Sequence, residues 1–292
     1  MRAFHLAYDR PVIFEDPFAA DLTNGFLRLM LGSRFVYRTV LDRMLGLRPI
    51  IAQSVARARY AEDELNKSAF RVRQYVVIGA GMDSFALRRS DLSESLRVYE
   101  IDHPATQQTK RERLSGLGVA LPANLEFVPA NLESESVAAA LARSSYSHSE
   151  QSFFSWMGTT PYLTKEAVFA TLASVSSCAA PGSHLIFDHL LPDDMLGRQD
   201  VELRDRGNRL LKFIGEPLIT ALDPRTLGNE LAALGFDLLE SLSPAEQKTR
   251  YFSARTDSLY PFPEGLVHVT VRGRGPEGRS GSASPIQGSG CG

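Results

Sequence analysis

Two short segments of the chain combine residue types that could hold a nucleoside cofactor. Residues 75–78 form an apolar run, and Gly79, Ala80 and Gly81 interrupt it before helical spacing of apolar residues resumes. Glycine allows a sharp backbone turn and lets a ligand approach closer than a Cβ would permit. A second apolar run ends at Asp102, about twenty residues further on, where a ribose-binding carboxylate is expected. Together the segments predict a nucleoside cofactor.

The residue types near the glycines also narrow the choice of cofactor. Ser84 stands where a third glycine would let the helix pack closely and receive a pyrophosphate on its N-terminus. This disfavours nicotinamide and flavin dinucleotides and favours cofactors without a pyrophosphate, of which S-adenosylmethionine is the commonest. The chain also has no recognisable Tyr-x-x-x-Lys dyad. A nicotinamide-dependent oxidoreductase is therefore the less favoured alternative.

Strand and helix patterns alternate along most of the chain, which predicts an α/β domain with a mostly parallel, doubly wound sheet. The predicted strands are residues 75–78, 97–102, 125–129, 152–156, 182–188, 238–239 and 267–271. The last two are expected to pair antiparallel at the sheet edge. One helix is predicted to start near Pro104 and another after a cap at Thr164. A third is predicted from Asp223 to Leu234.

Residues 11–66 show helical spacing and no convincing strand, which predicts a helical N-terminal cap. Asp16 and Pro17 are typical of a helix start. The apolar residues expected on one face of that helix are Phe18, Leu22, Phe26 and Leu29. Two further helices are predicted over residues 35–45 and 50–65. The alternative is that these helices only pack on the sheet edge.

Composition excludes several classes of function. The 292 residues are 43% hydrophobic and carry a net charge of -2, so a large core is expected and no nucleic-acid or anionic membrane partner is indicated. Two cysteines, Cys178 and Cys291, are too few for a disulfide framework or a structural zinc site, and no metal is expected. The small net charge favours a small-molecule acceptor substrate. No signal peptide or membrane-spanning run is recognised, so a cytoplasmic protein is expected.

Three motifs resemble successive motifs of the leucine carboxyl methyltransferase family. They are V-V-I-G-A-G-M-D-S-F-A-L-R, Y-E-I-D-H-P-A-T-Q-Q-T-K and S-W-M-G-T-T-P-Y-L-T, and the similarity extends from Pro11 to about Arg272. The resemblance includes the bacterial branch associated with polyketide O-methylation. It implies a Rossmann-like class I methyltransferase fold with a helical cap, S-adenosylmethionine as cofactor, and methyl transfer to an oxygen atom.

The same resemblance implies which residues bind the cofactor. They are Arg57, Gly79, Ala80, Gly81, Asp102, Asn131, Leu132 and Met157. Arg57 matches the arginine that holds the methionyl carboxylate, a role that suits the planar donor fork of a guanidinium. Two positions depart from the family pattern: Asn131 stands where relatives usually carry aspartate, and Met157 where many carry glutamate. A catalytically degenerate protein that still binds the cofactor is therefore a second alternative.

The candidate catalytic residues follow the fourth and fifth predicted strands. Tyr162 is expected at the substrate mouth or as a half-buried aromatic residue, while Asp188 and His189 could form an acid and imidazole pair that takes a proton from a phenol. A carboxylate acceptor would need no base, because its oxygen is already a nucleophile near neutral pH. Arg250 or Arg255 could bind an acidic acceptor, although solvated loop arginines are the simpler expectation.

These observations divide the chain into three parts. Residues 1–70 are expected to form the helical cap and residues 71–272 the S-adenosylmethionine-binding domain. Residues 273–292 are rich in glycine, serine and proline and nearly without apolar side chains, so they are expected to be a disordered tail that catalysis does not require.

Overall fold

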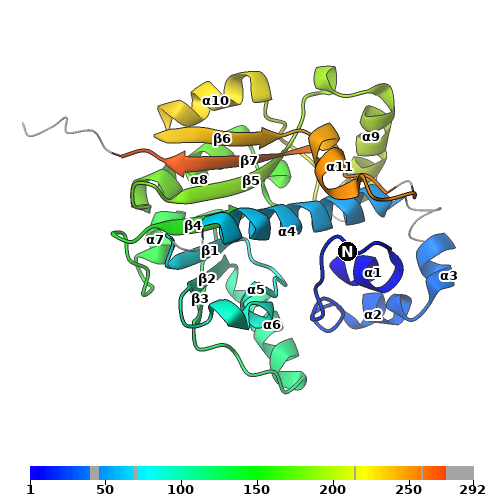
Figure 1. Ribbon diagram of the computed structural model, residues 1–292, viewed down its shortest axis with the longest axis horizontal. Coiled ribbons are helices and arrows are strands. Elements are labelled where there is room, and N and C mark those ends of the chain that lie inside the picture. Colours follow the sequence, from blue (N-terminus) through cyan, green and yellow to red (C-terminus); the bar gives the residue numbers. More distant parts are fainter. Residues whose placement is uncertain (40–45, 69–70, 214, 258, 274–292) are drawn as a thin grey trace, which may run out of the picture.

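The apolar runs along the chain come together as the strands of one mixed sheet (Figure 1). The computed structural model describes residues 1–39, 46–68, 71–213, 215–257 and 259–273. Within these ranges seven strands lie in the order β3-β2-β1-β4-β5-β7-β6. Their bounds are β1 Gln74–Ile78, β2 Arg97–Asp102, β3 Leu125–Pro129, β4 Ser152–Trp156, β5 His184–Leu190, β6 Phe236–Leu242 and β7 Glu264–Val271. The predicted tail from residue 274 onward lies outside the described residues.

Strand pairing confirms the predicted fold class and the antiparallel pairing of the last two strands at the sheet edge. The pairs β1–β2, β1–β4, β2–β3 and β4–β5 are parallel, whereas β7 is antiparallel to both β5 and β6. The antiparallel strand therefore lies one place inside the edge, because β6 occupies the edge itself. The carboxyl ends of all strands except β7 meet along one side of the sheet, where open α/β sheets bind their ligands.

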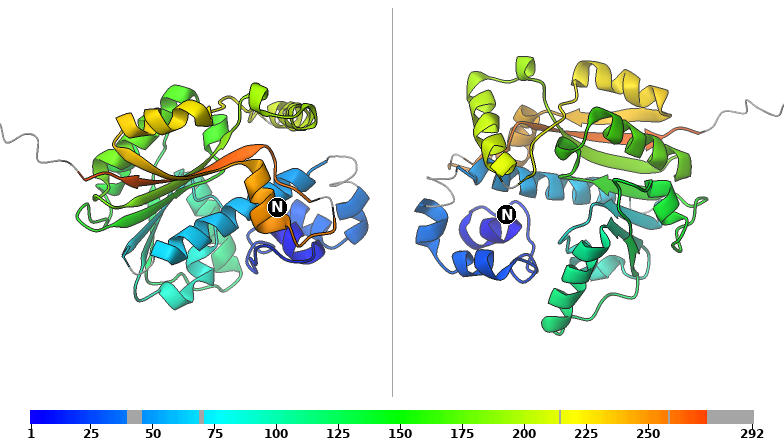
Figure 2. Two further views of the ribbon diagram at one scale, coloured as in Figure 1. Left: turned by 45° about the horizontal axis from the view of Figure 1, so that its top comes forward. Right: turned by 180° about the vertical axis from the view of Figure 1, so that it is seen from behind.

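Helices cover both faces of the sheet, since alternate side chains on each strand point to opposite faces. One face packs against α4 (Arg48–Ser68), α5 (Phe85–Arg88) and α6 (Pro104–Gly116). The other packs against α7 (Val137–Leu141), α8 (Lys165–Cys178) and α10 (Pro224–Ala233), as the view from behind shows (Figure 2). Helices α9 (Arg198–Phe213) and α11 (Pro244–Phe252) flank the carboxyl ends of the parallel strands.

The N-terminal cap consists of α1 (Arg2–Tyr8), α2 (Gly25–Leu31) and α3 (Arg34–Val36), beside the N-terminal half of α4 (Figure 1). The helix predicted from Asp16 through Leu29 is confirmed only in its second part. Turns follow Asp16, and α2 starts only at Gly25, with Asn24 as its N-cap. Phe26 and Leu29 are exposed, whereas Leu22 is buried. Of the helix predicted over 35–45, residues 40–45 lie outside the described residues.

Helix α4 joins the cap to the sheet. Near its start Ile51 packs with Phe4 of α1 and Tyr37, and near its end Tyr60 and Leu65 pack against the sheet. The predicted boundary at residue 70 stays a prediction, because one continuous helix contributes to both cores. Among the described residues, no helix combines the length and the apolar character that crossing a membrane requires.

Candidate functional site

The glycine turn after β1 adopts backbone angles that favour glycine. Gly79 and Gly81 have φ values of 67° and 52°. A Cβ on Gly79 would lie 2.8 Å from the Thr159 hydroxyl oxygen, so a side chain there would collide with the segment that follows β4. The backbone N–H groups of Gly79 and Ala80 both donate to the Ile101 carbonyl, at 2.9 and 3.2 Å, which fixes the turn against β2.

A cavity of about 290 Å³ lies beside this turn. Four of the predicted site residues line it: Arg57, Gly79, Ala80 and Met157. Further lining residues on α4 are Ser54, Ala58, Ala61 and Glu62, which recur at helical spacing around Arg57. That spacing could have identified them from the sequence once Arg57 was chosen. Other lining residues are Arg2, Tyr75, Val77, Ile78, Met82, Asp83, Phe85, Arg88, Ser155 and Gly158.

Arg57 reaches from α4 to the carboxyl ends of β4 and β5. Its Nη1 donates to Asp188 Oδ2 at 3.1 Å, and the guanidinium lies so close to Gly158 that a Cβ there would meet Nη2 at 2.7 Å. Burial opposes the charge of Arg57, but Asp188 and Glu264 outweigh it and raise the pKa of the guanidinium. The side chain is 29% exposed and lines the cavity, so it can still donate to a ligand carboxylate.

Asp102 ends β2 and faces the glycine turn. Its carboxylate accepts from the Gly81 N–H at 2.5 Å and from the His103 N–H at 2.6 Å, one bond to each oxygen. These bonds hold the side chain in place and leave further lone pairs for ribose hydroxyls. Asp102 and Gly81 do not line the cavity, which lies instead beside Arg57, Gly79 and Ala80.

Asn131 and Leu132 follow β3, where the adenine is expected. The Asn131 side-chain carbonyl accepts from the Glu133 N–H at 3.1 Å, forming a local turn in exposed backbone. The oxygen predicted to accept from an adenine amino group thus accepts one bond within the chain and keeps a second lone pair. Leu132 packs against the core beneath β3.

The predicted Asp188–His189 pair is not formed. As neighbours on β5, the two side chains point to opposite faces of the sheet. Asp188 faces α4, and its two oxygens accept from the Gly158 N–H at 2.9 and 2.8 Å. His189 lies against Gly265 on the other face, with Nδ1 donating to the Leu190 carbonyl at 3.0 Å, and burial lowers its pKa. An acid and imidazole acting together at this position are excluded by the strand geometry.

Tyr162 is the last residue of the 3₁₀ turn Thr160–Tyr162, which follows β4. Burial and the negative charge of Glu264 raise the pKa of its phenol, so it stays neutral at physiological pH. The positive charge of Arg57 acts in the opposite direction and lowers this pKa in part. Tyr162 does not line the cavity.

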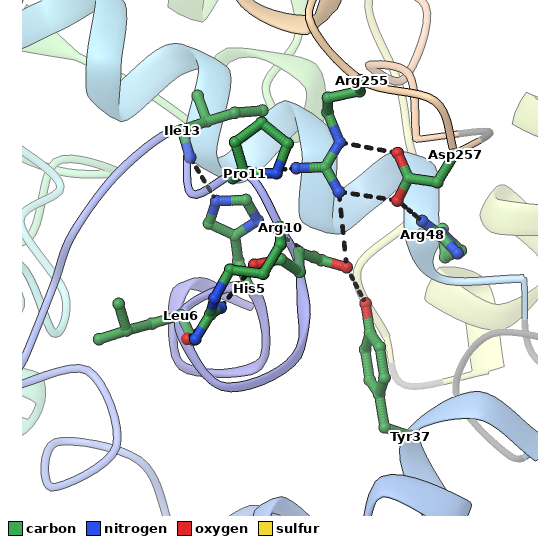
Figure 3. A network of polar contacts seen from close by, with 10 residues as sticks. His5, Leu6, Arg10, Pro11, Ile13, Tyr37, Arg48, Arg255 and Asp257 are labelled. Carbon is green, nitrogen blue, oxygen red and sulfur yellow. Dashed lines mark hydrogen bonds and ion pairs between the residues drawn. The ribbon is translucent and has the colours of Figure 1, made fainter.

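Arg250 and Arg255 are ion-paired rather than free solvated arginines. Arg250 donates to both carboxylate oxygens of Glu240, at 3.1 and 3.0 Å. The Arg255 side chain is only 1% exposed and forms two 2.7 Å bonds to Asp257 (Figure 3). Neither residue has its donor fork free for an acidic acceptor.

Arg255 belongs to a polar network that ties the cap to the segment after α11 (Figure 3). His5 Nε2 accepts from the Ile13 N–H at 2.8 Å, so Nδ1 carries the proton and donates to Asp9 at 3.0 Å. Tyr37 also donates to Asp9 at 3.0 Å. His5 and Asp9 form an imidazole and acid pair, but both ring nitrogens of His5 are hydrogen-bonded within the chain, so neither is free for catalysis.

Sequence reasoning did not identify three side chains of this region. Glu264 begins β7 and lies 4.0 Å from Arg57, Gln53 lies one helical turn before Arg57, and Arg2 lines the cavity from α1. Gln53 shares the helical face of Arg57, which is a usable signal. Nothing local marks Glu264 or Arg2, since tertiary folding alone brings them to the site.

Similarity to known proteins is consistent with this site. A family model described as Leucine carboxyl methyltransferase matches residues 1–176. A putative S-adenosyl-L-methionine-dependent methyltransferase of Bacillus subtilis is 30% identical over 278 residues, covering 89% of this chain and 91% of the relative. A similarly described protein of Mycobacterium tuberculosis is 29% identical over 191 residues, covering 61% of this chain and 60% of its own length.

A solved structure shares the fold at low sequence identity. A possible exported protein from Bordetella parapertussis superposes with a TM-score of 0.51 at 14% identity, covering 77% of this chain and 70% of that one. Magnesium protoporphyrin IX methyltransferase from Synechocystis PCC 6803 gives a TM-score of 0.49 at 9% identity, covering 77% and 86%.

Proposed function

The chain belongs to the leucine carboxyl methyltransferase family, and from that membership we propose that it transfers a methyl group from S-adenosylmethionine to an oxygen atom of a small-molecule acid, in keeping with a polyketide-like metabolite. The observation that carries the proposal is the convergence of the glycine turn, Arg57 and Asp102 at the carboxyl ends of the parallel strands.

The residues present fit the cofactor. The open face of the glycine turn admits its methionyl part, the Arg57 fork suits its carboxylate, and the lone pairs of Asp102 suit its ribose hydroxyls. Met157 lines the same cavity, while the loop of Asn131 and Leu132 borders the expected adenine position. When bound, the cofactor supplies a sulfonium methyl group as the electrophile. The chain supplies binding, orientation and exclusion of water.

A carboxylate is the acceptor group that this geometry favours. Asp188 is held by Gly158 and Arg57, and His189 faces the opposite side of the sheet. The two residues expected to share a proton are thus engaged elsewhere, and Tyr162 stays protonated. A carboxylate oxygen is already nucleophilic at neutral pH and needs only to be held in line with the methyl group. A phenol acceptor would need a base that these residues do not offer.

Calorimetric titration with S-adenosylhomocysteine, with NADH titrated in parallel, tests the cofactor. Micromolar binding of the first ligand alone is expected. Small carboxylic acids and phenols are then incubated with enzyme and trideuteromethyl-labelled cofactor, and the products are treated with alkali before mass spectrometry. Methyl esters lose the label in alkali and methyl ethers keep it, so alkali-labile label supports carboxyl transfer. Binding of NADH alone would contradict the proposal, and cofactor binding without transfer would favour a degenerate protein.

A further inference from the structure

Two buried carboxylates share the guanidinium of Arg57. In the β5–β7 pairing, Asp188 lies opposite Leu266 and Glu264 opposite Leu190. Asp188 and Glu264 both lie on the face of the sheet that α4 covers. Arg57 Nη1 is 3.1 Å from Asp188 Oδ2 and 4.0 Å from Glu264 Oε2. One positive charge therefore faces two acids in a region largely removed from water.

The two acids are satisfied to different degrees. Asp188 accepts from Arg57 and from the Gly158 N–H, whereas Glu264 Oε2 has no hydrogen-bond partner within the described residues. Gln53, also buried, has neither side-chain polar atom in a hydrogen bond of acceptable geometry among those residues. Asp188 is thus the fixed partner of Arg57, and Glu264 is the one whose interaction with the guanidinium is incomplete.

We propose that Glu264 is a positioning residue for cofactor binding. Its carboxylate competes with the cofactor's carboxylate for the guanidinium of Arg57. The inference rests on the proposed function, because it assumes that Arg57 holds that carboxylate. Glu264 does not line the cavity, so it acts through Arg57. An ionised Glu264 draws Arg57 toward β7, and a protonated Glu264 leaves the fork to the ligand.

The charges around Glu264 determine how this competition changes with pH. Burial and the neighbouring Asp188 raise the pKa of Glu264 to about 8, while Arg57 lowers it in part. Among the described residues, Arg57 also interacts electrostatically with the phenol of Tyr162, from the turn after β4, and with the N-terminal amine of Met1, whose pKa burial lowers to about 6. Glu264 is protonated below pH 8 and ionises above it, so affinity for a ligand carboxylate should fall as pH rises through 8.

The test is calorimetric titration between pH 6.5 and 8.5 with S-adenosylhomocysteine and with 5′-methylthioadenosine, which lacks the carboxylate. In the wild type, affinity for S-adenosylhomocysteine should fall about fourfold across this range, since only the fraction with protonated Glu264 is fully competent. Glu264→Gln, which is isosteric and cannot ionise, should remove the fall. Methylthioadenosine affinity should not change with pH in either protein.

Wild-type S-adenosylhomocysteine binding with no pH dependence would overturn the role of Glu264 while leaving the proposed function intact. The same holds if Glu264→Gln keeps the wild-type fall, because the fall would then belong to the ligand or to another residue. No binding of S-adenosylhomocysteine at any pH would overturn both proposals. The wild-type measurement needs no variant, so a folding defect in Glu264→Gln cannot obscure the result.

Discussion

At the scale of single residues, Gly79 offers the sharpest test of the cofactor site. Gly79→Ala should cost about 1 to 2 kcal/mol of stability, because an L residue at positive φ is strained. Contact of the new Cβ with Thr159 should also displace the turn and weaken S-adenosylhomocysteine binding at least tenfold, or about 1.4 kcal/mol. Urea unfolding and calorimetry measure the two effects. Gly118, with φ 68° and open space around it, provides the matched control. Gly118→Ala should lose stability and keep affinity, and equal affinities for both variants would contradict the assignment.

Asp102 permits a second test at this scale. Asp102→Ala removes the acceptor of the Gly81 N–H and of the expected ribose hydroxyls, so binding should weaken by about 1 to 3 kcal/mol. The loss should be equal for S-adenosylhomocysteine and methylthioadenosine, because both carry the ribose. Arg57→Ala, in contrast, should weaken only the ligand with a carboxylate. If the Asp102→Ala variant kept wild-type affinity for both ligands, a role of Asp102 in ribose binding would be excluded.

Single residues also show where sequence reasoning reaches its limit. The glycine turn and Asp102 are identified by a local motif and Arg57 by the family resemblance, and the structure brings all three to the carboxyl edge of the sheet. Glu264 lies far along the chain on an antiparallel strand, and its approach to Arg57 depends on the register with β5. No local pattern encodes that register. The expected Asp188–His189 pair is absent for a simpler reason: adjacent residues of a strand point to opposite faces of the sheet.

At the scale of elements, buried strands were predictable and the cap was only partly so. Every residue of β1 and β4 is buried, as expected of parallel strands covered on both faces. In the cap, apolar residues at helical spacing predicted one helix from Asp16, but turns replace its first part and α2 forms only its second part. The apolar face was expected to be buried, but Phe26 is 70% exposed and Leu29 79% exposed. Spacing alone could not show that this face lacks a covering element within the described residues.

Helix α6 supplies the element-scale prediction. It begins just after Asp102 and is fixed to β2 by the buried pair of Lys110 and Glu100, whose Nζ and Oε2 atoms are 2.5 Å apart. Lys110→Met leaves Glu100 as an unpaired buried carboxylate and should lower the free energy of unfolding by about 3 to 5 kcal/mol. The double variant Lys110→Met with Glu100→Leu should recover most of the loss. Urea unfolding measures both, and a fully stable single variant would contradict the pairing.

At the scale of the whole molecule, the site lies at the junction between the cap and the sheet. Helix α4 packs on α1 near its start and on the sheet near its end, and Arg57 lies between these two contacts. The polar network around Arg255 ties the cap to the segment after α11 (Figure 3). Movement of the cap relative to the sheet would therefore displace Arg57 directly, so cap packing and cofactor affinity should be coupled.

Acid stability tests the packing of the whole domain at the amino end of β5. His184 Nδ1 lies 3.0 Å from His268 Nε2, and His268 approaches Glu64 on α4. Burial, followed by the charge of His268, lowers the pKa of His184 to about 4 from an ordinary value near 6.5. Between these two values the unfolded chain binds more protons than the folded one, so stability should fall as pH drops from 6.5 to 4.

The variant His184→Asn keeps a polar atom near the Nδ1 position but cannot gain a charge, so it should flatten this fall while lowering stability somewhat at every pH. The difference in Tm between variant and wild type, followed across pH 4 to 7, cancels the titration of other groups. Glu264 is one of them, and its raised pKa acts in the opposite direction, since folding then favours the protonated acid as pH decreases. His103→Asn, at an exposed position, is the matched control and should follow the wild type. Parallel curves for His184→Asn and wild type would show that the histidine pair does not contribute to acid sensitivity, and the cause would then lie among the carboxylates.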